Sequence, residues 1–270
     1  MTPTESLMNR RSLLGTLAVL AFPASLSKVL AAPQGPRREV VIVEKANEIL
    51  IEMTKNSKHG VPLALLHKAQ GVILVPDLVR AGFVFGAEVG RGVLMSRDES
   101  GGWSYPLFLG MAGGSFGAQI GASASDLMLV FTTKKSVDDF LSHNKVTLGA
   151  DIAVAAGPIG REAGAGTDLK MRAEILSYSR SRGLFAGVSI EGTSLHVRHR
   201  ANDAFYGHSN MLVGDILAGK DSDDKALVVP PSAARLRATL DALCKPPKSK
   251  IDDPLIEKAE GRPKSNTRNR

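Results

Sequence analysis

The strongest constraint on the fold is an alternation of apolar residues with polar or small ones, which recurs from Gly71 to about Arg198. Side chains of a β-strand point alternately to its two faces, so a period of two predicts half-buried antiparallel strands. Twenty of the 27 glycines fall between Gly71 and Gly192, where they suit turns, bulges and bends. We therefore expect an α+β fold, mainly β: a curved, glycine-rich antiparallel sheet, barrel-like or sandwich-like, with helices at both ends.

The same patterns place the individual elements along the chain. Alternation predicts strands at 71–76, 82–90, 107–125, 146–156, 169–175 and 184–190. Apolar residues at helical spacing predict helices at 38–55, 63–69, 202–206 and 211–217, and a last helix that begins at Ser232. A capping-box pattern formed by Ser136 and Asp139 predicts one further helix inside the sheet region.

Residues 1–32 have the organisation of an export signal. Arg10 and Arg11 precede a short apolar stretch, and small residues predict cleavage after Ala31 or Ala32. The arginine pair followed by Ser-Leu-Leu resembles the twin-arginine signal, with an ordinary secretory signal as the alternative. Either signal predicts an exported bacterial protein, periplasmic or associated with the envelope. We expect no transmembrane span in the mature chain.

The net charge of +7 suggests nucleic acid as a partner until the charge is located. Residues 1–32 carry a net +2 and residues 245–270 a net +4, which leaves +1 for residues 33–244. A nearly neutral fold argues against nucleic-acid binding. The prolines and charges of 245–270 predict a disordered basic tail.

One motif suggests catalysis. Residues 113–117 fit the pattern Gly-x-Ser-x-Gly, which in hydrolases presents a serine on a turn between a strand and a helix. Here the alternation continues through Ser115, so we interpret the motif as part of a strand, and a serine hydrolase is a remote alternative. His196 and His199 would face opposite sides of a strand, and Cys244 is the sole cysteine. We therefore predict no catalytic residue, metal site or cofactor.

Several short motifs occur in a fixed order along the chain. They are Ala-Gln-Gly-Val-Ile-Leu-Val-Pro at 69–76, Gly-Arg-Gly at 90–92, Trp-Ser-Tyr-Pro at 103–106, Gly-Ala-Gln-Ile-Gly at 117–121, Ser-Tyr-Ser-Arg-Ser-Arg-Gly at 177–183, Ala-Asn at 201–202 and Phe-Tyr-Gly at 205–207. Together they resemble the SYLF domain family over residues 38–208, which leaves 209–244 as a helical C-terminal extension. The resemblance implies a lipid-binding domain without catalysis, whose fungal members also bind actin filaments.

Six basic residues form the candidate lipid site. If 169–179 pairs with 184–198, one sheet face and its rim gather Lys170, Arg172, Arg180, Arg182, Arg198 and Arg200. Such a cluster would attract lipid phosphates, and a solvated sheet face is the alternative.

From these observations we expect a non-enzymatic phospholipid-binding protein of the bacterial cell envelope. Its partner would be anionic phospholipid or a membrane surface, while actin is not expected in that compartment. An envelope scaffold that binds an unknown protein partner is the alternative.

Overall fold

The computed structural model describes residues 36–55, 60–82, 85–116, 121–159, 173–181 and 183–244. The predicted leader, the predicted tail after Cys244 and three of the candidate basic residues, Lys170, Arg172 and Arg182, lie outside the described residues. Within the described part, every helix is too short or too polar to cross a bilayer.

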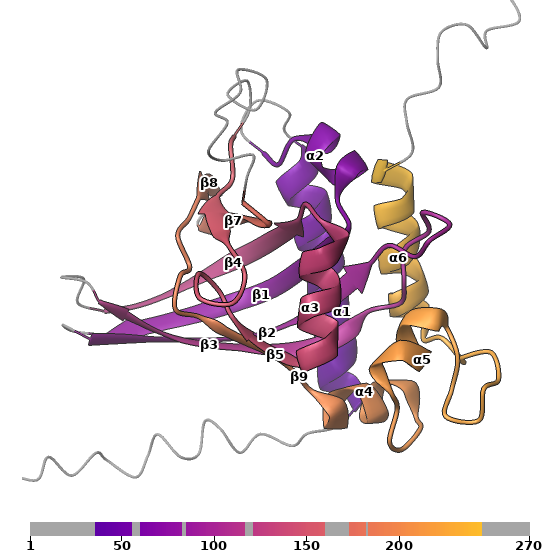
Figure 1. Ribbon diagram of the computed structural model, residues 1–270. Helices are drawn as coiled ribbons and strands as arrows, with labels where there is room; N and C mark the ends of the chain where they lie inside the picture. The colour runs from indigo at the N-terminus through magenta and orange to yellow at the C-terminus, as the bar shows by residue number, and fades with distance from the viewer. Residues whose placement is uncertain are drawn as a thin grey trace, which may run out of the picture. The chain divides into compact units, whose positions relative to one another are not determined.

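The fold is mixed α+β and is organised around one curved sheet (Figure 1). Its strands are β1 (Gly71–Gly82), β2 (Phe85–Ser96), β3 (Leu107–Phe116), β4 (Gly121–Phe131), β5 (Lys145–Thr147), β6 (Val154–Ala156), β7 (Ile175–Ser181), β8 (Leu184–Gly187) and β9 (Ser194–Val197). Their order is β5-β9-β3-β2-β1-β4-β7-β6, and β8 pairs with β7. Within the described residues the order ends at β5 and β6, so the sheet is open there. All the paired strands are antiparallel except β6 and β7.

The predicted fold class is confirmed, but three predicted strands each span parts of two observed strands. The segment 82–90 contains the end of β1 and the start of β2, which pair as a hairpin. The segment 107–125 contains all of β3 and the start of β4. Likewise, 146–156 contains parts of the two short strands β5 and β6 rather than one long strand.

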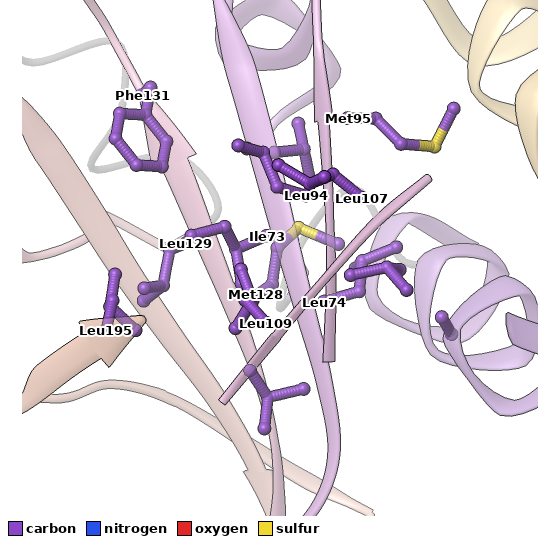
Figure 2. Close-up of a cluster of buried hydrophobic side chains, with 14 of the residues drawn as sticks. Ile73, Leu74, Leu94, Met95, Leu107, Leu109, Met128, Leu129, Phe131 and Leu195 are labelled. Carbon is purple, nitrogen blue, oxygen red and sulfur yellow. The ribbon is translucent and has the colours of Figure 1, made fainter. Parts of the chain in front are cut away.

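The core occupies both faces of the sheet where the first half of β1 lies beside the second half of β4. All residues from Gly71 to Pro76 are buried, since helices cover one face and the edge strands curl over the other. Figure 2 shows this division: Leu74 and Met95 point toward the helices, whereas Leu129 and Leu195 lie on the opposite side.

A bulge in β1 separates this core from the second half of the strand. The register shifts between Leu74 and Val79, so β1 contains one residue more than the stretch of β2 that it faces. Asp77, inside the bulge, has a positive φ of 48°. The extra residue changes which side chains face the helices: Leu74 does so before the bulge, and Val79 does so after it.

Helices α1 (Pro36–Lys55), α2 (Leu63–Lys68) and α6 (Pro231–Cys244) pack together, and α1 also covers part of β1 and β2. Helix α1 ends where it was predicted to end and begins two residues earlier. Val43, Ala46, Leu50 and Met53 form its buried stripe at helical spacing. The remaining helices are α3 (Lys134–His143), α4 (His199–Tyr206) and α5 (Val213–Ala218).

The predicted cap of α3 is shifted by one helical turn. Thr133 is the N-cap, and its hydroxyl accepts a hydrogen bond from the Ser136 backbone N–H at 3.2 Å. The Ser136 hydroxyl donates back to the Thr133 carbonyl at 2.9 Å. Ser136 is therefore the third residue of the helix (N3), and not the N-cap that the sequence predicted.

Candidate functional site

Beyond the bulge, strands β1 to β4 continue past the helices (Figure 1). The strand register places two rows of residues side by side, on the same side of the sheet as α1 but beyond the part that α1 covers. The first row is Ala112, Val89, Val79 and Ala124, and the second is Gly114, Ala87, Ala81 and Ala122. All eight are exposed, and Val79 and Val89 retain 48% and 56% of their accessible surface. We call these eight residues the apolar face.

A groove lies where the apolar face meets α1. Its lining consists of Arg38, Val41, Ile42, Lys45, Pro76, Asp77, Val79, Val89, Gly90 and Arg91. Val79 and Val89 belong to both surfaces, and Val41 of α1, which is 47% exposed, lines the groove with them. The groove therefore extends the apolar face toward the basic side chains of Arg38, Lys45 and Arg91.

The opposite face of the same strands is polar, and it is covered around Glu88. There Glu88 is buried and accepts a hydrogen bond from Arg80 Nε at 2.9 Å and another from the Thr193 hydroxyl. Gly113 lies directly beside this cluster, since a Cβ on it would come within 3.0 Å of Glu88 Oε1 and 2.8 Å of Thr193 Oγ1. The charges of this region are thus paired, whereas the apolar face has none.

Ion pairs join α1 to the sheet near the groove. Lys45 pairs with Asp77 of the bulge, and this hydrogen bond raises the pKa of Lys45. On β7, Arg180 Nε lies 3.4 Å from Asp126 Oδ2, and Arg180 Nη1 lies 3.6 Å from Glu52 Oε2. By contrast, Arg38 and Arg91 form no ion pair with any described residue.

The structure separates the described members of the predicted basic site. The expected pairing of 169–179 with 184–198 holds only for the β7–β8 hairpin, because β9 pairs with β3 and β5 instead. Strands β3, β2, β1 and β4 therefore lie between Arg180 and the segment that carries Arg198 and Arg200. Arg198 is half-buried, and its burial lowers the pKa of its guanidinium.

Ser115 lies within β3, opposite Gly86 of β2. Phe116 ends β3, and the described residues that follow it, from Gly121, form strand β4 rather than a helix. The described backbone around Ser115 therefore lacks the helix that follows the serine of a hydrolase.

The apolar face was not predicted from the sequence. Six of its residues were assigned to half-buried strands, where either set of alternating side chains can face the core, and Val79 and Ala81 fell between the predicted strands 71–76 and 82–90. The sequence did contain one signal for it. At 81–87 and at 112–124 the odd-numbered and the even-numbered residues are both mostly small or apolar, with few charges to mark the side that faces solvent.

Comparison with known proteins shows to which family the chain is related. Residues 112–243 match the Ysc84 family, described as Las17-binding protein actin regulator. LAS seventeen-binding protein 3 of Saccharomyces cerevisiae is 36% identical over 192 residues, which are 68% of this chain and 41% of that protein. The chain belongs to the SYLF, or Ysc84, family. SH3 domain-containing YSC84-like protein 1 of Xenopus laevis is 36% identical over 181 residues, 65% of this chain and 54% of that protein.

SYLF-family membership supports a binding role rather than a catalytic one. Protein YSC84 of Saccharomyces cerevisiae is 34% identical over 214 residues, 77% of this chain and 44% of that protein. The chain thus spans between about two fifths and a little over half of these relatives.

Asn202, in one of the SYLF motifs, joins α4 to β3. Its side-chain oxygen accepts a hydrogen bond from the Phe108 backbone N–H at 2.8 Å, and its amide donates to the Arg198 carbonyl at 3.2 Å. Two neighbours reinforce the junction: the Phe108 and Phe205 rings meet edge to face, and the Tyr206 hydroxyl donates to the Pro106 carbonyl at 2.7 Å. Asn202, Phe205 and Tyr206 therefore have a structural role, since they hold α4 against β3 and the segment before it.

Asn202→Ala should lower the free energy of unfolding by about 1–3 kcal/mol, because it leaves the buried N–H of Phe108 without an acceptor. Chemical denaturation of the purified chain measures this loss. His199→Ala, at an exposed position of the same helix, is the control and should change stability by less than about 0.5 kcal/mol. Equal losses in both variants would mean that the stability depends on any change in this helix, and not on the hydrogen bond from Phe108 to Asn202.

Proposed function

We propose that this SYLF-family chain is a non-catalytic phospholipid-binding protein of the bacterial cell envelope. The observation that carries the proposal is the continuity of the exposed apolar face with a groove that Arg38, Lys45 and Arg91 line. The leader at 1–32 supports export to the envelope, through its arginine pair and its short apolar stretch.

The apolar part of this surface suits the boundary between lipid head groups and acyl chains. Contiguous exposed apolar residues are uncommon on soluble proteins and mark contact with membranes or partners. Here the exposed side chains are alanines and valines on strands whose backbones are paired with one another. A surface of this kind can lie against a bilayer without unpaired polar atoms on its face.

The basic side chains suit the phosphates at the same boundary. Each basic residue near an anionic membrane contributes on the order of 1 kcal/mol, and salt screens that attraction over about 8 Å at 0.15 M. Arg38 and Arg91 are the stronger candidates, because Lys45 is paired with Asp77. Of the basic residues predicted from the sequence, Arg200 is exposed and would be a secondary contact, whereas two carboxylates hold Arg180.

Val89→Glu should weaken binding of the chain to anionic phospholipid vesicles by about tenfold or more. The substitution removes apolar contact and adds a charge that the membrane repels, and tenfold corresponds to about 1.4 kcal/mol. Co-sedimentation with vesicles of phosphatidylglycerol and phosphatidylcholine measures the affinity. Arg91→Gln should weaken binding less, and binding by the unmodified chain should weaken as salt is added.

Val228→Glu is the matched control, because Val228 is 75% exposed and lies outside the apolar face and the groove. It makes the same change in net charge and should leave binding unchanged. If both valine variants bind equally well, the contact lies elsewhere, and the tail and the basic residues predicted from the sequence become the next candidates. If the unmodified chain binds no vesicles, the lipid proposal is wrong.

The second candidate function is an envelope scaffold for a protein partner. It is favoured by the name of the yeast relative, LAS seventeen-binding protein 3, which records a protein ligand for that relative. A scaffold that uses the same apolar face would lose its partner in Val89→Glu and show no vesicle binding in any form.

A further inference from the structure

A row of basic side chains crosses the sheet directly beside the apolar face. Four residues of neighbouring strands lie opposite one another in register: Lys145 of β5, His196 of β9, Gly110 of β3 and Arg91 of β2. Residues that lie opposite one another belong to the same side of a sheet, and two residues further along β3 and β2 that side carries Ala112 and Val89 of the apolar face. We call Lys145, His196 and Arg91 the basic row.

Gly110 allows the imidazole of His196 to lie flat over the sheet. A Cβ on Gly110 would collide with Nε2 and Cε1 of His196, so the ring occupies the place that a side chain of β3 would take. Because Gly110 is the residue between His196 and Arg91, no side chain of β3 separates these two basic groups. His196 remains exposed on its outer side.

The elements around His196 present basic groups to it. Partial burial against the sheet, followed by the charges of Arg198 at the N-cap of α4 and Lys145 of β5, lowers the pKa of His196 below its ordinary value of about 6.5. Strand β3 contributes no charge, since its residues 107–116 are all uncharged, and Arg91 lies beyond it. The imidazole is therefore neutral near pH 7.5, and an anion from outside the chain would favour its charged form.

We propose that His196 makes membrane binding depend on pH: once protonated, it joins Arg91 and Lys145 as a contact for lipid phosphates, and the chain binds anionic membranes more tightly. This inference rests on the proposed lipid function and names its regulation. The position of the row fits that role. The nearer row of the apolar face lies about 7 Å beyond it along the strands, comparable with the roughly 5–10 Å to which apolar faces enter the boundary between head groups and acyl chains.

The direction of the effect follows from linkage. Lipid phosphate favours the charged imidazole, so the pKa of His196 is higher in the membrane-bound chain than in the free chain. The added affinity is complete below the pKa of the free chain and is lost as the pH rises through the pKa of the bound chain. Acidification therefore strengthens binding, and neutral pH weakens it.

Co-sedimentation with vesicles of phosphatidylglycerol and phosphatidylcholine at about pH 7.5 and about pH 5, at constant ionic strength, tests the proposal. The phosphodiester of phosphatidylglycerol keeps its charge over this range, so the protein supplies the change. Binding by the unmodified chain should strengthen about fivefold at the lower pH, as expected for one added charge near an anionic surface. His196→Gln should lose this gain and bind normally at about pH 7.5. His199→Gln, at an exposed histidine of α4 outside the basic row, is the matched control and should keep it.

His196→Lys supplies the converse test, because its charge is permanent. At about pH 7.5 it should bind as tightly as the unmodified chain does at about pH 5, and it should not respond to acid. Melting curves should show that all three variants are folded, since His196 and His199 are exposed. A gain that persists in His196→Gln, an unmodified chain that binds equally at both pH values, or a His196→Lys variant that binds no more tightly would each overturn this inference and leave the lipid function standing. A chain that binds vesicles at neither pH would refute the lipid function itself.

Discussion

Replacing Gly92 by alanine should destabilise the chain by at least about 3 kcal/mol. A Cβ on Gly92 of β2 would lie 2.2 Å from the Leu74 carbonyl oxygen and 2.9 Å from Val75 Cγ2. The carbonyl belongs to the backbone of the adjacent strand, so no rotamer change removes the clash, and β1 must move away from β2. Thermal denaturation should show a melting temperature lower by about 6–12 °C.

Gly114→Ala is the control for this effect, because it places the same methyl group in the same sheet. The nearest atom to a Cβ there is the Gly86 carbonyl oxygen, at 3.8 Å. Its stability should change by less than about 0.5 kcal/mol. If both variants lost stability equally, the loss would come from the backbone conformation that glycine allows, and not from the close approach of β1 to β2.

Arg80→Ala should cost about 3 kcal/mol, because it leaves the buried carboxylate of Glu88 with the Thr193 hydroxyl as its remaining described partner. Removing one member of a buried ion pair usually costs about 3–5 kcal/mol, and Arg80 belongs at the lower end because 30% of its side chain is exposed. Urea denaturation measures the loss.

The double variant Arg80→Ala with Glu88→Gln separates charge from packing. A neutral amide keeps the acceptor for Thr193 and removes the uncompensated charge, so most of the lost stability should return. A double variant that is no more stable than Arg80→Ala would instead assign the loss to the aliphatic stem of Arg80.

The sequence predicted the helices well because each carries a signal within its own residues. In α1 the buried residues recur at helical spacing, so its end at Lys55 was predicted and its start at Pro36 missed by two residues. The turns between strands carried a weaker signal. Paired residues of β1 and β2, such as Ala81 and Ala87, are both odd-numbered, so the alternation continues unchanged from one strand into the next. A single long strand gives the same pattern.

The candidate site depended on information that alternation does not contain. Strand β9 has four residues, and nothing in them specifies β3 rather than β7 as a partner. The prediction that one sheet face and its rim gather Arg180 and Arg198 failed for that reason. The apolar face depends on where the helical layer ends, and that position is set by the bulge around Asp77, which tertiary contacts determine.

The late position of β9 in the chain also orders the steps of folding. Val197 pairs with Leu109, 88 residues earlier, whereas Gly82 of β1 pairs with Gly86 of β2, four residues later. Such long-range pairing has a high loop-closure entropy and slows folding. During synthesis from the N-terminus, β1 to β4 are complete well before β9 has been translated. Until then, the edge of β3 that pairs with β9 has no partner on the nascent chain. The last part of the sheet to be translated is thus the part that protects it from aggregation.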